Sequence, residues 1–129
     1  MNDIFDKILR KEIPAQFVYE DDVCVVVMDK YPVVPGQVLV IPRDCIDYFF
    51  EMDDVKYHHC LSIAKRMAAA LDVTYETERT CMIIEGFEVP HAHLKLYPVT
   101  RREFTPHGGK EVDDATLEKE AEKIKANLR

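Results

Sequence analysis

The stretch "EVPHAHLKLYP" (residues 88–98) places His91, His93 and Lys95 at every second position, with small or apolar residues between them. In a β-strand, residues two apart point to the same face and stand about 6.6–7 Å apart. The alternation therefore predicts a strand that turns its alanine and leucines toward the core and carries two imidazoles and an ammonium in a row on the other face.

Three interpretations of this row are open from the residues alone. A solvent-facing strand can carry polar residues for solubility only. Two histidines one residue apart can chelate zinc, but zinc needs a third ligand and a protonated Lys95 is a poor one. In the third interpretation, His93 acts as a nucleophile or acid/base near neutral pH while Lys95 holds a phosphate group. The positive charge of Lys95 would also lower the pKa of His93 and favour the neutral imidazole.

The residues that precede this row predict a short helix and three strands. Apolar residues at helical spacing predict a helix in "DIFDKILR" (residues 3–10), capped by Asp3. Two strands, residues 17–21 and 23–32, are predicted to form a hairpin, the second being a β-branched run suited to burial on both faces. A third buried strand is predicted over residues 38–41.

A long helix is predicted from Asp53 to about Leu71, where apolar residues return every three or four positions. Strands over residues 80–86 and 89–98 follow it, and a peripheral helix rich in glutamate and lysine is predicted over residues 113–129. The predicted class is α+β: an antiparallel sheet of about five strands crossed by one long helix, with a short N-terminal helix and a peripheral C-terminal helix.

Composition predicts one globular domain over residues 1–129, with its core in about residues 1–104 and a loop and helix in residues 105–129. The chain is 47% hydrophobic, which is ordinary for a protein with a buried core. Its four cysteines lie far apart with no C-x-x-C pair, so reduced thiols are expected rather than disulfides.

Net charge and hydropathy exclude several classes of partner. A formal net charge of -7 argues against nucleic-acid binding, which depends on basic surfaces that neutralise phosphates. The N-terminal residues do not form a signal peptide, and no apolar run is long enough to span a membrane. A cytoplasmic protein without membrane contact is expected, and a small anionic ligand remains open where positive charge gathers locally.

The sequence resembles the histidine-triad (HIT) family of nucleotide hydrolases and transferases. "VPHAHLKLYP" is similar to the family motif His-φ-His-φ-His-φ-φ, with Lys95 where the third histidine stands. "IFDKILRKEIPAQFVYEDD", "MDKYPVVPGQVLVIPR" and the helix before the motif are similar to family segments in the same order, from about residue 4 to residue 104. The resemblance implies the HIT-like fold, a purine nucleotide as ligand and a homodimer.

The resemblance also implies roles for individual residues. His93 would attack the α-phosphate and form a nucleotidyl-histidine intermediate that water then cleaves, and His91 would orient groups within the site. Asp29 would hold the ribose hydroxyls, for which a carboxylate is a suitable acceptor. The positions that match the wall of the base pocket are Phe5, Ile8, Val27 and Lys30.

One departure from the family concerns metal binding. Many relatives bind a structural zinc through an N-terminal C-x-x-C and a histidine after "VIP". This chain has Asp3, Asp6 and Cys45 at the matching positions, so no metal and no other cofactor is expected.

Other departures concern the phosphate site. Phe87 and Glu88 replace a glutamine and a small hydroxyl residue before the first histidine, so Glu88 is expected at the nucleotide site with altered phosphate contacts. Lys95 can hold a phosphate, but an ammonium only donates protons, whereas an imidazole both donates and accepts them. Two functions remain open. The first is a hydrolase or transferase acting on a nucleoside phosphoramidate, an adenylate or a dinucleoside polyphosphate. The second is a non-catalytic nucleotide-binding module with a degenerate triad.

Overall fold

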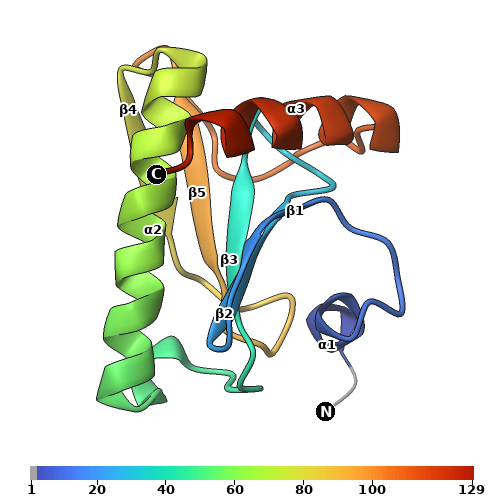
Figure 1. Cartoon of the computed structure of the whole chain (residues 1–129), viewed down its shortest axis with the longest axis vertical. Helices are drawn as coiled ribbons and strands as arrows, with labels where there is room; N and C mark the ends of the chain where they lie inside the picture. The colour runs from blue at the N-terminus through green and yellow to red at the C-terminus, as the bar shows by residue number, and fades with distance from the viewer. Residues whose placement is uncertain (1–2) are drawn as a thin grey trace.

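The structure is a computed structural model that describes residues 3–129, and its centre is an antiparallel sheet of five strands (Figure 1). The strands lie in the order β1-β2-β3-β5-β4. Their bounds are β1 Phe17–Glu20, β2 Cys24–Met28, β3 Val38–Pro42, β4 Arg79–Ile83 and β5 Leu94–Val99. The helices are α1 Ile4–Leu9, the 3-10 helix η1 Phe49–Glu51, α2 Asp54–Tyr75 and α3 Asp114–Asn127. The predicted α+β class and five-stranded antiparallel sheet are confirmed.

Helices cover both faces of the sheet, which explains the uninterrupted β-branched runs (Figure 1). One face packs its side chains, including Val26 and Val40, against α2 and α3. The opposite face packs Val27 and Leu39 against α1. Every residue of β2 and β3 is buried. A strand with both faces buried gains from an apolar side chain at every position.

The N-terminal helix begins as predicted, with Asp3 as its cap. The Asp3 carboxylate accepts a hydrogen bond from the backbone N–H of Asp6 at 2.8 Å, and the Asp6 carboxylate accepts one from the N–H of Asp3 at 3.2 Å. This reciprocal capping box satisfies backbone donors that a six-residue helix would otherwise leave free. It also turns two carboxylates toward the segment that carries His91.

The predicted strand over residues 89–98 is too long. β5 begins at Leu94, which pairs with Val40 of β3, and His91 and His93 lie in the segment just before it. If β5 extended further toward its N-terminus, the added residues would pair with Pro42 of β3. Proline has no N–H to donate to such a ladder. Its carbonyl oxygen instead accepts a hydrogen bond from His91 Nε2 at 2.8 Å. The ladder therefore ends where the histidines begin.

The C-terminal helix extends the core beyond residue 104. Its apolar side chains Leu117, Ala121 and Ile124 are buried in the main core, beside α2 and β1. Figure 1 shows α3 lying across one end of the sheet. The four cysteines are free thiols, as predicted. Among residues 3–129, no helix combines the length and apolar character needed to cross a bilayer.

Candidate functional site

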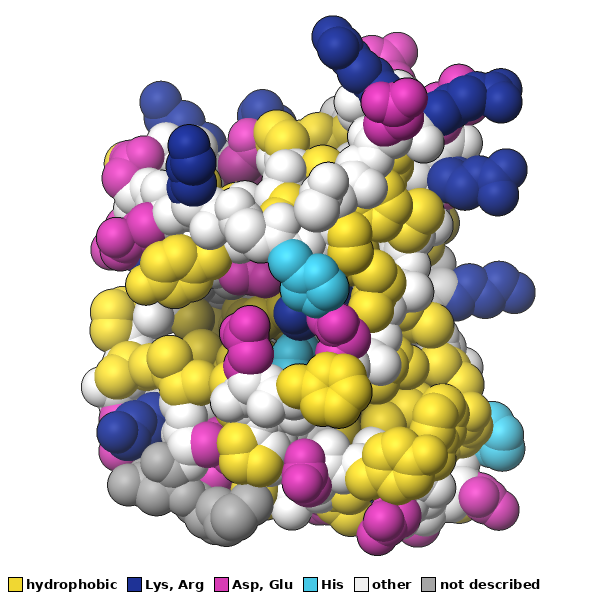
Figure 2. Space-filling view, turned by 180° about the vertical axis from the view of Figure 1, so that it is seen from behind, with side chains coloured by type: hydrophobic (Ala, Val, Ile, Leu, Met, Phe, Trp, Pro, Cys, Tyr) yellow, Lys and Arg dark blue, Asp and Glu magenta, His cyan; other side chains and the backbone are white. Residues whose placement is uncertain are grey.

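A cavity of about 1060 Å³ lies over the α1 face of the sheet. Its lining comes from α1, the end of β2, the β4–β5 link, β5 and the loop that follows β5. Figure 2 shows this hollow with histidine, acidic and basic side chains gathered around it. It includes eight of the nine predicted site residues: Phe5, Ile8, Val27, Asp29, Lys30, Glu88, His93 and Lys95. His91 is the predicted residue that does not line it.

His93 is held in a single tautomer by the backbone. Its Nδ1 lies 2.8 Å from the carbonyl oxygen of His91, and a carbonyl only accepts, so Nδ1 carries the hydrogen. Nε2 is then the nitrogen with the free lone pair. Burial lowers the pKa of His93, and the charge of Lys95 lowers it further, as the sequence predicts. The Phe5 ring packs against the imidazole in an edge-to-face arrangement, with ring centroids 4.6 Å apart.

His91 lies beneath the cavity rather than in it. The side chain is completely buried, and Nε2–H donates to the carbonyl oxygen of Pro42. The other nitrogen, Nδ1, lies 3.3 Å from Asp3 Oδ2 and 3.6 Å from Asp6 Oδ1. His91 therefore contacts His93 through its backbone carbonyl, while its imidazole faces the cap of α1.

Asp3, Asp6, Cys45 and His91 form a compact cluster of four potential metal ligands. Their ligating atoms all lie within 4.8 Å of one another. Cys45 Sγ lies 3.8 Å from Asp3 Oδ2 and 3.7 Å from Asp6 Oδ2. Tetrahedral zinc with ordinary bond lengths places its ligands roughly 3.3–3.6 Å apart.

The chemistry of this cluster also suits a cation. Nε2 of His91 carries a hydrogen, so Nδ1 is the nitrogen that faces the two carboxylates. Among residues 3–129, this buried nitrogen makes no well-formed hydrogen bond. Burial and the nearby Asp6 carboxylate raise the pKa of the Cys45 thiol, so the cluster by itself opposes ionisation of that thiol. The four side chains therefore fit a divalent cation, even though the sequence predicts no metal.

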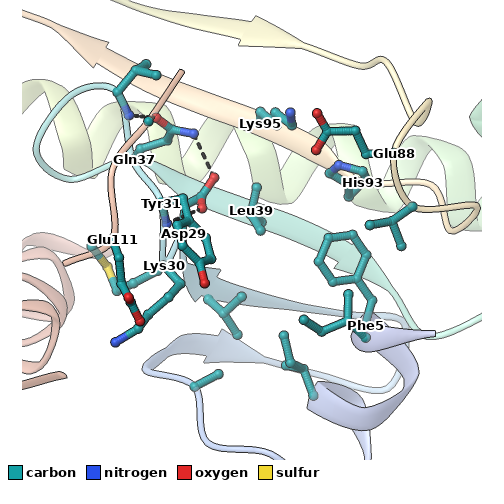
Figure 3. Close-up of a pocket in the computed structure, with 18 of the residues that line it drawn as sticks. Phe5, Asp29, Lys30, Tyr31, Gln37, Leu39, Glu88, His93, Lys95 and Glu111 are labelled. Carbon is teal, nitrogen blue, oxygen red and sulfur yellow. Dashed lines mark hydrogen bonds between the residues drawn. The ribbon is translucent and has the colours of Figure 1, made fainter. Parts of the chain in front are cut away.

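Asp29 is held at the end of β2 with its carboxylate in the cavity. Oδ1 accepts a hydrogen bond from the N–H of Tyr31 at 2.8 Å, and Oδ2 accepts one from Gln37 Nε2 at 2.7 Å (Figure 3). The Gln37 side chain is buried, and its Oε1 accepts from the N–H of Val33 at 2.7 Å. Gln37 is thus a positioning residue that sequence analysis missed.

Beside Asp29, the cavity has an apolar wall. Phe5, Ile8 and Val27 form it, and Leu39 joins them from β3. Lys30 does not belong to this apolar surface. Its ammonium pairs with Asp114 of α3 at 2.8 Å, and this contact raises the pKa of Lys30. Lys30 therefore lies at the rim, where it connects the cavity to α3.

Charged groups surround Lys95 on the other side of the cavity. Its Nζ lies 3.6 Å from Glu85 Oε1. The same carboxylate contacts His107 Nε2 at 2.8 and 3.0 Å. The hydrogen bond from His107 lowers the pKa of Glu85, and the charge of Lys95 lowers it further. Glu88 lines the same cavity as His93 and Lys95, and Figure 3 labels all three. Neither Glu85 nor His107 lies in a recognisable local pattern, so the sequence does not mark them as site residues.

Comparisons with known proteins show which family this chain matches. The sequence model of the HIT domain matches residues 10–101. An uncharacterized HIT-like protein of Synechococcus elongatus is 38% identical over 98 residues, covering 72% of this chain and 86% of the relative. The purine nucleoside phosphoramidase of Escherichia coli is 31% identical over 102 residues, covering 72% of this chain and 83% of the relative.

Solved structures share the fold over almost the whole chain. A HIT-like protein of Bartonella henselae, described as involved in cell-cycle regulation, has a TM-score of 0.88 at 26% identity, covering 98% of this chain and 96% of that one. A zinc-bound histidine triad family protein of Mycobacterium smegmatis has a TM-score of 0.80 at 21% identity, covering 97% of this chain and 91% of that one. At that identity the second likeness concerns the fold.

Proposed function

The chain belongs to the HIT domain family, and from this premise we propose that it is a nucleotidyl hydrolase or transferase acting on a purine nucleoside phosphate derivative. A phosphoramidate, an adenylate or a dinucleoside polyphosphate would be cleaved at the α-phosphate. The observation that carries the proposal is the His93 tautomer: the bond from Nδ1–H to the His91 carbonyl leaves the Nε2 lone pair as the nucleophile.

In the first step, the Nε2 lone pair of His93 attacks the α-phosphorus and forms a P–N bond. The bond from phosphorus to the leaving group breaks, and the leaving atom takes that electron pair and a proton. In the second step, the oxygen of water attacks phosphorus and loses a proton, the P–N bond breaks, and its electron pair returns to Nε2. The products are a nucleoside monophosphate and the protonated leaving group.

The other cavity residues bind and orient the nucleotide. Asp29 is fixed on both oxygens by Tyr31 and Gln37, so its remaining lone pairs are preorganised for the ribose hydroxyls. The wall formed by Phe5, Ile8, Val27 and Leu39 suits a flat base. Lys95 supplies positive charge for the phosphate. Asp29 and Lys95 thus account for the two polar ends of a nucleoside phosphate.

A non-catalytic nucleotide-binding module is the second candidate. Lys95 is partly neutralised by Glu85, and the Glu88 carboxylate, which also lines the cavity, would repel a phosphate. Both features weaken the phosphate site without affecting the ribose and base contacts. Such a protein would bind nucleotides and form no covalent intermediate.

An adduct experiment separates the two candidates. The protein is mixed briefly with a purine nucleoside phosphoramidate, the reaction is quenched, and the mass of the intact protein is measured by mass spectrometry. We expect a mass increase of one nucleotidyl group, located on His93 by peptide mapping. His93→Ala should abolish the adduct and turnover yet retain nucleotide binding, because the nucleophile acts mainly in the transition state. Binding without any adduct or turnover in the parent protein would favour the non-catalytic module.

We propose that the cation-fitting cluster has a structural role in this enzyme. Asp3, Asp6, Cys45 and His91 would hold a divalent cation. When bound, it would supply positive charge that neutralises the two carboxylates and ties α1 to the histidine segment. Since His91 also presents its carbonyl to His93, this would stabilise the nucleophile's tautomer.

We also propose a homodimer formed through the β4 edge of the sheet. Within residues 3–129, β4 pairs with β5 on one side, and its Met82 is exposed, as is Val73 on the adjacent α2. A second copy paired along this edge would cover its backbone groups and these apolar side chains. Light scattering should give twice the chain mass of 15.0 kDa at micromolar concentration, and a monomer would contradict the proposal.

A further inference from the structure

Glu85 joins two cationic or proton-carrying groups at the mouth of the cavity. Its carboxylate contacts Lys95 Nζ from β5 and His107 Nε2 from the loop that follows β5. All three residues line the cavity that contains His93. An imidazole therefore stands near the triad's third position, although residue 95 itself is a lysine.

The loop that carries His107 is fixed on both sides of this residue. On the N-terminal side, the Tyr97 hydroxyl donates to the carbonyl oxygen of Pro106 at 3.3 Å. On the C-terminal side, Gly109 packs so closely on Tyr31 that a Cβ there would stand 1.9 Å from the Tyr31 carbonyl oxygen. Val112 N–H then donates to the Lys30 carbonyl at 3.0 Å. These contacts anchor the loop to the sheet at the edge of the cavity.

We propose that His107 is the proton donor and acceptor for this site, taking over the acid–base chemistry that Lys95 lacks, and that Glu85 positions it. The proposal rests on the function proposed above. Lys95 contributes a fixed charge for the phosphate, whereas an imidazole can give a proton in one step and take one in the next. The two roles of one histidine are thereby divided between Lys95 and His107.

The proton transfers balance over the two steps. In the first, protonated His107 keeps its Nε2–H bond to Glu85 and gives the Nδ1 proton to the leaving atom as the bond from phosphorus breaks. His107 is then neutral, and His93 carries the nucleotidyl group. In the second, His107 Nδ1 takes a proton from the attacking water, while the P–N electron pair returns to His93. At the end of the second step, His107 is protonated again and His93 is again a neutral imidazole without the nucleotidyl group.

Two leaving groups on the same nucleotide test this assignment. An alkylamine phosphoramidate must protonate its nitrogen before it leaves, whereas a p-nitrophenyl ester of the same nucleoside monophosphate leaves as a stable anion. Formation of the His93 adduct is measured by rapid quench for the parent, His107→Gln and Glu85→Gln. His58→Gln makes the same change as His107→Gln at an exposed histidine on α2, outside the cavity, and it serves as the control.

We expect His107→Gln to slow adduct formation from the phosphoramidate by roughly 100-fold or more, the scale of general acid catalysis. The p-nitrophenyl ester should lose less than about 5-fold, since it needs no proton. Glu85→Gln should show the same split to a smaller extent, and His58→Gln should match the parent with both substrates. A rate loss with the phosphoramidate but not with the p-nitrophenyl ester indicates proton transfer, because general loosening of the loop would slow adduct formation from both substrates.

Equal rates of parent and His107→Gln with the phosphoramidate would overturn the assignment of His107. Equal loss with both substrates would also overturn it, because His107 would then act in binding or structure. Either result leaves the His93 adduct, and hence the proposed function, intact. If the parent forms no adduct with either substrate, the proposed function fails and the role of His107 fails with it.

Discussion

The Nδ1–H of His93 donates a 2.8 Å hydrogen bond to the carbonyl oxygen of His91, two residues earlier in the same segment. This contact exists because β5 begins only at Leu94, which leaves the His91 carbonyl free of the strand ladder. The side chain of His91 points instead to the cap of α1. The two histidines thus have different roles: His93 is presented to the cavity, and His91 connects the cavity floor to the N-terminal helix.

Asp29→Ala should weaken nucleoside binding far more than pyrophosphate binding, because the ribose hydroxyls are its proposed partners. Loss of a hydrogen bond to a charged group costs about 1.5–3 kcal/mol. Gln37→Leu should cause a smaller loss of the same kind, since it frees Asp29 Oδ2. Isothermal titration with a nucleoside monophosphate and with pyrophosphate measures the ratio. Asp22→Ala is the control at an exposed aspartate, and an unchanged ratio in Asp29→Ala would remove Asp29 from the ribose site.

Asp21→Asn should destabilise the protein at pH 7 and lose part of that effect at pH 3. Asp21 accepts hydrogen bonds from the Tyr19 hydroxyl, the backbone of Val23 and Cys24, and His59. Burial alone would raise the pKa of Asp21, but these bonds outweigh it and hold the pKa well below its usual range. The stabilisation is therefore complete above the unfolded pKa of about 3.9 and is lost as pH falls toward the folded value.

Urea unfolding at the two pH values measures this effect. At pH 7, Asp21→Asn should lose about 1.5–3 kcal/mol of unfolding free energy, the scale for hydrogen bonds to a charged group. The difference in unfolding free energy between the parent and Asp21→Asn should decrease at pH 3, because Asp21 binds a proton in the unfolded parent at this pH but not in the folded parent. Asp22→Asn supplies the control. A difference that is equal or larger at pH 3 would show that Asp21 does not stabilise the fold through its charge.

Local sequence patterns were sufficient to predict most of the fold. β-branched runs mark β2 and β3 because both faces of those strands are buried, and Asp3 caps α1 where helical spacing begins. The start of β5 could not be read from alternation alone. It depends on Pro42, which is distant in sequence and provides no N–H for a longer ladder.

The candidate site was predicted only in part, because local motifs mark some of its residues and contacts between distant segments determine the others. His93, Lys95 and Asp29 lie in motifs, so their place in the cavity could be anticipated. Gln37 contacts Asp29, and His107 contacts Glu85, which is 22 residues away in the chain, so no local motif marks either residue. The sequence marks Asp3, Asp6 and Cys45 as the positions of a family zinc site, but no metal was expected there because carboxylates replace the cysteines; only folding shows that His91 joins them.

Adding zinc to chelator-treated protein should raise its melting temperature, because a ligand that binds only the folded state stabilises it. Cys45→Ala should reduce this shift by removing one of the four ligands, while Cys81→Ala, a half-buried thiol on β4, should keep it. Native mass spectrometry should count one zinc per chain in the parent. A zinc shift of equal size in Cys45→Ala, or an absence of bound zinc in the parent, would contradict the proposed cluster.

Lys95→Ala should reduce both nucleotide affinity and the rate of adduct formation. Removing one preorganised donor to a transferring group typically costs about 100-fold or more in rate. Binding should also become less sensitive to added salt, because one cation is lost from the site. Lys65→Ala removes an exposed lysine from α2 and should match the parent.

Lys95→His tests whether Lys95 contributes to the reaction or whether its presence has inactivated the site. If Lys95 holds the phosphate while His107 transfers the proton, Lys95→His should not raise turnover. A large gain would show that residue 95 is where the missing imidazole is needed, and unchanged rate and affinity in both variants would show that Lys95 does not touch the substrate.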